Sequence, residues 1–467
     1  MDDNNLMFPG KEDNTPAVKK NEAPGKAVAK AAAETKAAPA VKKAPENKPS
    51  TDVKKSKKVV STEVSGETRP YNASTVASKD SVDEDYLTKK RNKKKKRNKI
   101  ILGVVMALLG LIIGVVGFLF WYKNYLFSKV EFIPEQTVTF VNDEGVTIDV
   151  GELRKEVEPV IPVIEDESIK NFLLIGIDSR SRSYSSDGKG GLADVIMIMS
   201  VDNKEGTIKL VSVARDSYAY VPGYKRPMKI NAAMSQGGPE LLQLTLENSL
   251  RIPIDGYAYV NFYHMVGVID AVGGVYVNVT NSELYSAAGL NDNLAEINRI
   301  SGYAEDYQKV TSTGDVWLNG RQAVAYARIR HVDSDYKRSE RQVEVLRSLL
   351  SQFMNMGAIQ KVTCLDDILG LVATNIQQDE IEKYAFDFLP SIQNLHMQYF
   401  QLPLEGFFNS GMYGDEWSIR NNWNMTIPYV QEYLYGERKD FDRVDEIPSA
   451  PADDSCPKDF DVQAHIS

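Results

Sequence analysis

Residues 171–178 read Asn-Phe-Leu-Leu-Ile-Gly-Ile-Asp, a run of apolar and small residues between two polar ones. Such a run is typical of a strand that is buried on both faces of a sheet. Residues 195–201, 208–213, 257–262 and 275–279 indicate further strands, and helical spacing of apolar residues appears at 241–250 and 262–272. Alternating strands and helices predict an α/β domain, with a sheet that helices cover on both faces.

The segment before this domain has a different composition. Residues 1–99 hold 24 Lys and Arg against 14 Asp and Glu, although the whole chain has a net charge of −9. The segment is rich in Ala, Lys, Pro and Glu, so it has too little apolar surface to fold alone. We expect a disordered basic tail over residues 1–99. It shows no helix-turn-helix pattern, and we expect no nucleic-acid partner.

Residues 100–122 form an uncharged, apolar run that ends in Phe118, Phe120, Trp121 and Tyr122. As a helix this run is roughly 34 Å long, enough to cross a bilayer. Nine Lys and Arg residues lie just before it, between 89 and 99, which favours a cytoplasmic N-terminus and an extracellular C-terminal part. A single-pass protein of the cell membrane is therefore expected. A cleaved signal peptide or a buried core helix are the alternatives.

Two further segments are expected to flank the domain. Residues 123–167 show some β-like alternation and are predicted to form a stalk or ancillary hairpin. Residues 436–467, acidic and containing three prolines, are predicted to form a disordered tail. The two cysteines, Cys364 and Cys456, exclude a disulfide scaffold and are interpreted as free thiols.

The strongest candidate for a ligand-binding segment is residues 325–331, Ala-Tyr-Ala-Arg-Ile-Arg-His. This segment alternates like a strand, which would place Arg328 and Arg330 on one face. A helix predicted from Arg338 to Met356 would bring Arg338 and Gln342 close to the strand's end. Converging guanidinium groups indicate a phosphate-bearing ligand. The alternative is a charged surface with ordinary ion pairs.

Other polar residues stand at the ends of the predicted strands, where open α/β sheets bind ligands. They are Asp178, Asp194, and Arg215 with Asp216, and Lys229 adds one more cation. Two carboxylates beside a phosphate suit Mg²⁺. Turn caps and a surface lysine are the alternatives. The chain lacks the phosphate-loop, Gly-x-Ser-x-Gly and His-Glu-x-x-His motifs, which argues against common nucleotide hydrolases, serine hydrolases and zinc proteases.

Several of these motifs, in this order, resemble the LytR-CpsA-Psr family. They include Phe172-Leu-Leu-Ile-Gly-Ile-Asp178-Ser-Arg180, Ala193-Asp194, Val213-Ala-Arg215-Asp216-Ser-Tyr218, Lys229-Ile-Asn231, Leu318-Asn-Gly320 with the segment to His331, and Asp335-Tyr-Lys-Arg338-Ser-Glu-Arg341-Gln342. The resemblance covers about residues 168–435. It implies an α-β-α sandwich with a central mixed sheet.

The resemblance also implies a function. Members of the family attach glycopolymers, such as teichoic acid or capsular polysaccharide, from a polyprenyl-pyrophosphate carrier to peptidoglycan. This chain would then be a membrane-anchored phosphotransferase, with pyrophosphatase as a side activity, and its partners would be the lipid-linked glycan, peptidoglycan and the bilayer. By resemblance the catalytic residues are Arg215, Asp194, Arg328 and Arg330.

The remaining site residues are assigned in the same way. Arg215, Arg328, Arg330 and Gln342 match positions that bind the pyrophosphate, while Arg338, Asp335 and Lys229 match positions around the substrate. Asp178 and Asp194 match the magnesium ligands. An apolar tunnel for the lipid is also implied. Asp194 or Asp216 would take the proton of the acceptor hydroxyl.

The chain departs from the family pattern at three positions. Leu192 replaces a usual arginine, Val195 a usual hydroxyl residue, and Ala232 a common histidine. Arg180 or Arg182 is a possible replacement for the missing arginine. These departures keep open the alternative of a scaffold that binds lipid pyrophosphate without turnover. A second alternative, which the family's historical name contains, is a membrane-anchored regulator of envelope assembly that acts through the tail.

Overall fold

The computed structural model describes residues 77–133, 138–164, 166–178, 191–330, 332–388 and 396–466. The predictions for residues 1–76 and for Arg180 and Arg182 lie outside the described residues. The fold is organised around a seven-stranded sheet with the order β1-β12-β9-β4-β5-β6-β13. Three strand pairs are parallel (β1 with β12, β4 with β9, β6 with β13) and three are antiparallel (β12 with β9, β4 with β5, β5 with β6), so the predicted central mixed sheet is confirmed.

The strands of this sheet follow the apolar runs of the sequence. Their bounds are β1 Glu131–Phe132, β4 Ile169–Ile177, β5 Ala193–Asp202, β6 Thr207–Val213, β9 Gly256–Asn261, β12 Ala373–Thr374 and β13 His396–Leu402. No residue of the central strands β4 and β5 is exposed, as expected for strands that helices cover on both faces.

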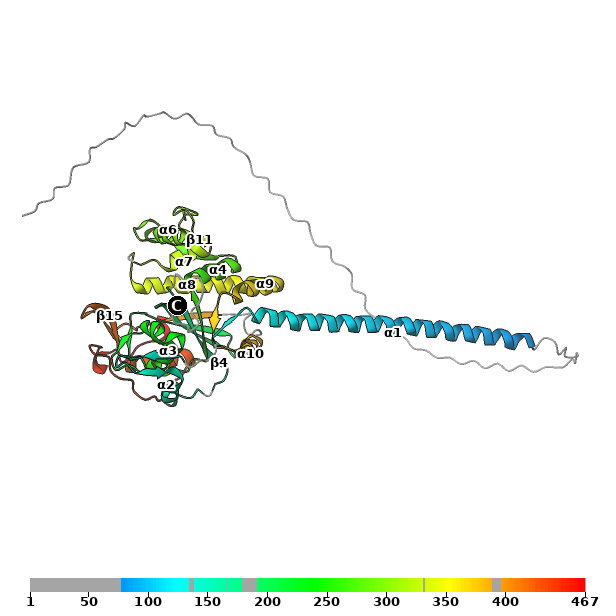
Figure 1. Cartoon of the computed structure of the whole chain (residues 1–467), viewed down its shortest axis with the longest axis horizontal. Coiled ribbons are helices and arrows are strands. Elements are labelled where there is room, and N and C mark those ends of the chain that lie inside the picture. The colour runs from blue at the N-terminus through cyan, green and yellow to red at the C-terminus, as the bar shows by residue number, and fades with distance from the viewer. Residues whose placement is uncertain are drawn as a thin grey trace, which may run out of the picture. The chain divides into compact units, whose positions relative to one another are not determined.

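Helices form a layer on each side of the sheet (Figure 1). On one side lie α4 Phe262–Val272, α7 Gly320–Ala327 and α8 Asp335–Asn355, and on the other lie α2 Val150–Val157, α3 Ala232–Leu250 and α11 Trp423–Tyr435. Leu173 and Ile175 of β4 pack with α3 and α11, whereas Met197 of β5 packs with Val343 of α8. The predicted α-β-α sandwich is therefore confirmed.

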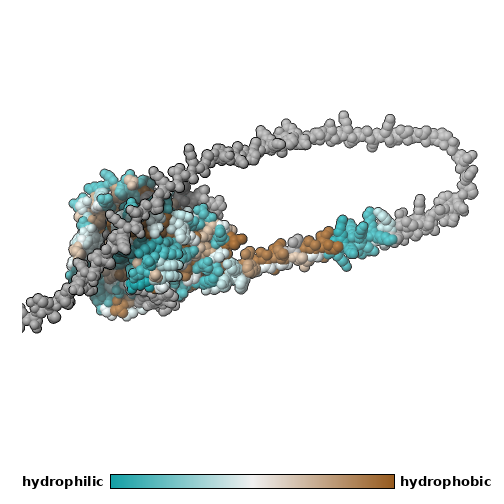
Figure 2. All heavy atoms as spheres, turned by 90° about the horizontal axis from the view of Figure 1, so that it is seen from above, coloured by the Kyte–Doolittle hydropathy of each residue, from teal (hydrophilic) through white to brown (hydrophobic). Residues whose placement is uncertain are grey.

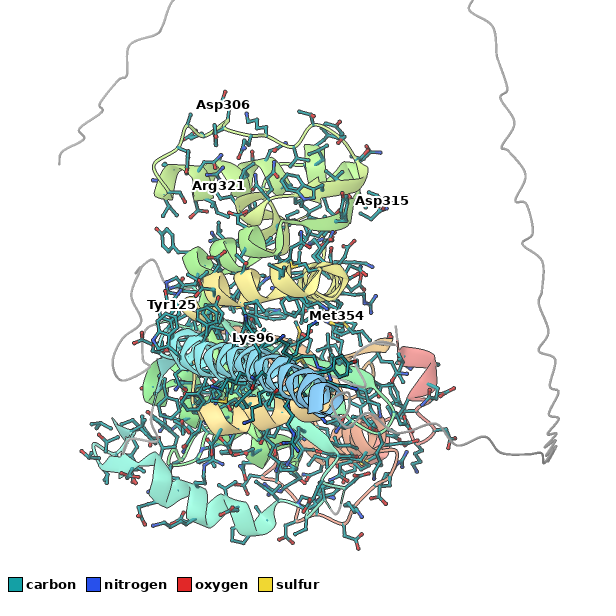
Figure 3. The ribbon with its side chains drawn as sticks, turned by 90° about the vertical axis from the view of Figure 1, so that its right-hand side faces the viewer. Lys96, Tyr125, Asp306, Asp315, Arg321 and Met354 are labelled. Carbon is teal, nitrogen blue, oxygen red and sulfur yellow. The ribbon has the colours of Figure 1, made fainter. Side chains whose placement is uncertain are left out.

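Residues 282–316 form a lobe that contains several regular elements. They include α5 Asn281–Tyr285, α6 Leu290–Ile300 and most of β11 Gly314–Leu318, which pairs with β10 Val275–Val279. Figure 3 labels Asp306, Asp315 and Arg321 in this lobe. The guanidinium of Arg321 lies 4.0 Å from the ring centroid of Tyr303, which ties α7 to the loop after α6.

Three short strand pairs and two helices complete the fold. The hairpins are β2 Thr139–Val141 with β3 Thr147–Asp149, β7 Tyr218–Ala219 with β8 Met228–Lys229, and β14 Phe408–Tyr413 with β15 Glu416–Asn421. Helices α9 Ala358–Leu369 and α10 Gln378–Phe388 flank β12 in the sequence. The β2–β3 hairpin agrees with the predicted ancillary hairpin. However, Phe140 and Val157 belong to the main core, so the compact domain begins before residue 168.

The prediction of a disordered C-terminal tail was wrong. Residues 436–466 have little regular structure, but Ile447, Cys456 and Val462 are buried in the core beside α11. Backbone and side-chain hydrogen bonds anchor the segment, for example from Asn424 Nδ2 to the carbonyl oxygen of Val444 at 2.9 Å. A few apolar residues spaced far apart are enough to hold a coil on a preformed surface, and composition averages hide them. Both cysteines are free, as predicted, and both are buried.

Helix α1 runs from Ala77 to Phe127, so residues 77–99 are helical and the prediction of disorder for them was wrong. Lys and Arg are good helix formers, and they continue the helix that the apolar run begins. The stretch Thr88–Phe127 is long and apolar enough to cross a membrane. Figure 2 shows its apolar part in brown, next to the hydrophilic part that carries the Lys and Arg residues. These features agree with single-pass anchoring.

Candidate functional site

Asp194 is the centre of the candidate site. It lies at the start of β5 and is buried, with 9% of its surface exposed. Its Oδ1 atom accepts a hydrogen bond from Nη1 of Arg215, and its Oδ2 atom accepts one from Nη2 of Arg330 at 3.1 Å. Three predicted site residues from distant parts of the sequence are therefore in direct contact.

Arg338, near the start of α8, approaches Asp194 from a third direction. Its Nη2 atom donates to the backbone carbonyl oxygen of Asp194 at 2.9 Å and lies 3.8 Å from Oδ2. Only 7% of the Arg338 side chain is exposed, compared with 22% for Arg215 and 36% for Arg330. Arg338 thus fixes the position of Asp194 from the buried side, while the guanidinium groups of Arg215 and Arg330 are accessible to a ligand.

A second carboxylate extends the network to the β14–β15 hairpin. Oδ2 of Asp216 accepts a hydrogen bond from Nε of Arg215 at 3.2 Å, and Oδ1 lies 3.1 Å from Nζ of Lys229. Lys229 Nζ is also 3.8 Å from Oε2 of Glu416. The predicted residue Lys229 is therefore part of the site. Glu416 was not predicted, because a single acidic residue in a hairpin far along the chain has no distinctive sequence pattern.

Arg328 and Arg330 do not lie on a strand, contrary to the prediction. Residues 320–327 form α7, which Asn319 caps through a hydrogen bond from the N–H of Gln322 to its side chain, and Arg328 is the C-cap. The Ala-rich, buried composition of this segment favours a helix over a strand. The guanidinium of Arg328 lies 4.4 Å from the ring centroid of Phe262. The aromatic face supports this cation without neutralising it.

The charged groups border an apolar cavity of about 250 Å³ between the sheet and helices α4, α7 and α8. Asp194, Arg328, Arg338 and Gln342 contribute its polar lining. The rest is almost entirely apolar; the lining residues include Leu174, Met197, Val260, Met265, Leu346 and Leu349. Gln342 also donates from Nε2 to the carbonyl oxygen of Ala327 at 3.4 Å, which links α8 to the end of α7. The cavity suits a ligand with a long apolar part and an anionic group.

Asp178 directly follows β4 and is exposed. It lines a smaller pocket together with Arg328. Because Ile177 pairs with Ala193 across the β4–β5 ladder, Asp178 and Asp194 stand at the same end of these two strands. Two carboxylates are a donor set that fits Mg²⁺ when phosphate oxygens complete the coordination. Within the described part of the chain, no cluster of three or more His, Cys, Asp or Glu residues is placed to hold a metal without such help.

Arg341 belongs to a different cluster, although it is only three residues from Arg338. Its side chain is 3% exposed, and Nη1 contacts Oε1 of Glu283 at 3.0 Å and Oδ2 of Asp333 at 2.8 Å. Nη2 donates to the carbonyl oxygen of Ile329 at 3.0 Å, between the two site arginines. Burial lowers the pKa of Arg341, but the hydrogen bonds to Asp333 and Glu283 outweigh it and raise the pKa overall. Arg341 holds the loop and has no direct access to a ligand.

The remaining predicted site residue is Asp335, the first residue of α8, one turn before Arg338. Its side chain lies outside the described part. Of the departures from the family pattern, Leu192 is exposed beside Asp178, whose N–H donates to the Leu192 carbonyl oxygen at 3.4 Å. Val195 lines the apolar cavity, and Ala232 is the first residue of α3.

Comparisons with known proteins agree with this architecture. The model of the LytR_cpsA_psr family matches residues 138–427. The polyisoprenyl-teichoic acid–peptidoglycan teichoic acid transferase TagU of Bacillus subtilis is 29% identical over 307 residues, covering 65% of this chain and 84% of that protein. The Enterococcus faecalis protein of the same name is 27% identical over 331 residues, covering 69% of this chain and 92% of that protein.

Solved structures share the fold. The crystal structure of protein gbs0355 from Streptococcus agalactiae matches with a TM-score of 0.50 and 23% sequence identity, covering 60% of this chain and 92% of that one. At this level of identity the match is one of fold. It supports the sandwich architecture independently of the site residues.

Proposed function

Because this chain belongs to the LytR-CpsA-Psr family, we propose that it transfers a glycopolymer from a polyprenyl-pyrophosphate carrier to peptidoglycan. The observation that supports this most directly is the arginine cluster around Asp194 at the border of an apolar cavity. A polyprenyl-pyrophosphate glycan combines the two properties that this site matches: a long apolar chain and a concentrated negative charge. The relatives named as teichoic acid transferases support the same substrate class.

In this proposal the arginines bind and stabilise the pyrophosphate. Arg215 and Arg330 are partly exposed, at 22% and 36% of the side chain, so the guanidinium of each can be reached by phosphate oxygens. The acceptor hydroxyl attacks the phosphorus next to the glycan, and the P–O bond inside the pyrophosphate breaks. Negative charge then grows on the leaving polyprenyl phosphate. Preorganised cations at that position lower the barrier, because they need no reorganisation.

Mg²⁺ is the cofactor that we propose for this site, held by Asp178 and Asp194. When bound, it would neutralise pyrophosphate charge as a Lewis acid. Asp194 also orients Arg215 and Arg330, and Asp216 orients Arg215 and Lys229. Both carboxylates are engaged in ion pairs, so their first role in this proposal is to hold the cations in place.

The proposed location follows from the same reasoning. Peptidoglycan lies outside the cell membrane, and the basic residues before the apolar part of α1 favour a cytoplasmic N-terminus. The domain would then face the outside, anchored by α1. Cysteine-accessibility labelling on intact cells tests this orientation: a domain residue that reacts only after cell lysis would contradict it.

The transfer itself is tested with the full chain in detergent, Mg²⁺, a synthetic polyprenyl-pyrophosphate oligosaccharide and a peptidoglycan oligomer, with mass spectrometry of the product. We expect a joined glycan, lost in Arg215→Ala and retained in Arg299→Ala, which removes an exposed arginine of α6. Normal transfer by Arg215→Ala would contradict the proposal.

Leu192 favours a second candidate, a scaffold that binds the lipid pyrophosphate without turnover. An exposed leucine stands where the family usually has an arginine, so one phosphate donor is missing beside Asp178. The same assay separates the two functions. Lipid that binds tightly with no conjugate, while a relative such as TagU forms one in parallel, would favour the scaffold.

A further inference from the structure

Helix α9 presents an unusual apolar stripe to the outside of the domain. Ile359 is 84% exposed, Val362 42% and Leu365 38%, and their spacing of three residues places them on one side of the helix. Cys364, by contrast, is only 3% exposed and packs into the core beneath α4, α7 and α8. Helix α9 is therefore anchored by its inner face and leaves three aliphatic side chains uncovered.

The connectivity of the chain places this stripe near the end of the apolar helix α1. Only residues 128–130 separate the last residue of α1, Phe127, from β1. Four Cα–Cα steps span at most about 14 Å, whatever direction α1 takes. Glu131 of β1 pairs with Ala373 of β12, which follows α9 after three residues. The C-terminal end of α9 is thus held close to the point where α1 ends.

Two ion pairs strengthen this link. Nζ of Lys129, two residues after α1, contacts Oδ1 of Asp366 in α9. Nζ of Lys123 in α1 contacts Oε2 of Glu382 in α10 at 2.9 Å. Asp366 lies one residue after Leu365, and Ile359 is about two helical turns further, or roughly 10 Å. The whole stripe is therefore within a short distance of the membrane surface from which α1 emerges.

We propose that α9 docks on the bilayer that α1 spans, with Ile359, Val362 and Leu365 inserted at the boundary of headgroups and acyl chains. Lipid is the occupant that fits, because a helix tethered beside a membrane anchor meets the interface at a very high local concentration. The stripe is also narrow and purely aliphatic. It lacks the Trp, Tyr and Arg residues that dominate protein–protein binding energy.

Docking of α9 has a consequence for substrate entry, which rests on the proposed function. Val372 follows α9 after two residues and lines the apolar cavity together with Val345 and Leu349 of α8. When α9 is docked, the side of the cavity that Val372 lines therefore lies close to the outer leaflet of the bilayer. The polyprenyl chain would move from the bilayer to the cavity without exposing its apolar surface to water, which is energetically costly.

The docking is tested by spin labelling of the full chain in vesicles of equal parts phosphatidylcholine and phosphatidylglycerol. A nitroxide attached to Ile359→Cys is compared with one at Val163→Cys, an aliphatic position of similar exposure (82%) between α2 and β4. The unsubstituted chain, whose two cysteines are buried, gives the background. We expect the ratio of collisions with oxygen to collisions with a nickel chelate to be at least threefold higher at position 359.

Equal ratios at the two positions would overturn the proposal. Spin–spin broadening at 359 that disappears on dilution with unlabelled chain would also overturn it, because it would mean that a second copy covers the stripe.

Activity gives an independent measurement. In Ile359→Glu/Val362→Glu we expect transfer from a vesicle-embedded donor to fall about tenfold, with an unchanged rate on a short-chain, water-soluble donor; Val163→Glu serves as the control. An equal loss on both donors would indicate damage to the fold and contradict docking as the cause. If no chain transfers either donor, the proposed function fails, while the spin-label result still decides the docking.

Discussion

Two arginine clusters lie side by side in this protein, and they differ in charge balance and exposure. The site cluster combines five cations (Arg215, Arg328, Arg330, Arg338 and Lys229) with three carboxylates (Asp194, Asp216 and Glu416). The buried cluster combines Arg341 with Glu283 and Asp333. The first has an excess of positive charge, and the second has an excess of negative charge.

This difference shows which arginines can serve a ligand. An anion adds favourable charge to the site cluster, where Arg215 and Arg330 remain 22% and 36% exposed. The buried cluster has no unmet positive charge, and its arginine is 3% exposed. Arg341 instead connects α8 to the carbonyl oxygen of Ile329, and so fixes the loop that carries Arg328 and Arg330. In the proposed function the site cluster binds the ligand, and the buried cluster holds the loop that positions Arg328 and Arg330.

The largest expected effect is on stability, in Arg341→Met. Removing the cation leaves two carboxylates without their partner, one of them buried, and breaking a buried ion pair typically costs about 3–5 kcal/mol. We expect a loss of that size in the free energy of unfolding, measured by denaturant titration of the full chain in detergent micelles.

A matched variant separates charge from packing. In Arg341→Met/Glu283→Gln/Asp333→Asn no uncompensated charge remains, so most of the lost stability should return. If the triple variant is as unstable as the single one, the cluster stabilises by packing and not by its charges.

Arg330→Met should produce the opposite pattern. Loss of one preorganised cation at a charge-developing group typically reduces a rate on the order of 100-fold, and the partly exposed side chain contributes on the order of 1 kcal/mol or less to folding. We expect transfer to fall strongly while the denaturant midpoint stays close to that of the unsubstituted chain. A large loss of stability with normal transfer would reverse the roles of the two clusters.

The sequence predicted the site cluster better than it predicted the structures that carry it. Arg215 and Asp194 were singled out because they follow or begin a strand with a clear apolar pattern, Arg330 because it stands in an arginine-bearing alternating segment, and Lys229 as one more cation. The structure brings all four together. The segment that carries Arg328 and Arg330 was predicted to be a strand. Short alternation in an Ala-rich segment cannot distinguish a strand from a buried helix, and the Asn319 cap decides for the helix.

Sequence patterns could not predict that Arg338 contacts the site and Arg341 the buried cluster. Both stand early in the same helix, and only long-range packing shows that one reaches Asp194 and the other Glu283. The same limit explains Glu416 and the packed C-terminal segment. Their positions depend on contacts between distant residues, such as Lys229 with Glu416, that leave no local periodicity.

Salt should also distinguish the two clusters. Exposed charges are screened within about 8 Å at physiological ionic strength, and buried pairs much less. We expect the affinity for magnesium pyrophosphate, measured by calorimetry, to fall about tenfold between 50 and 500 mM NaCl. Over the same salt range, the difference in unfolding midpoint between the unsubstituted chain and Arg341→Met should change little, because the buried ion pairs are screened much less. An affinity independent of salt would mean that the site arginines do not bind the anion.

The smallest effect concerns the outermost member of the site cluster. Glu416 is about half exposed and lies 3.8 Å from Lys229 Nζ. A negative charge roughly 6 Å from a bound anion costs about 0.7 kcal/mol in water, or about a threefold change in affinity. Glu416→Gln should therefore bind pyrophosphate about threefold more tightly, because it adds to the positive excess. Glu305→Gln, an exposed glutamate in the loop after α6, should have no effect. Weaker binding in Glu416→Gln would mean that Glu416 matters by positioning Lys229, and the net charge of the cluster would no longer explain its preference for an anion.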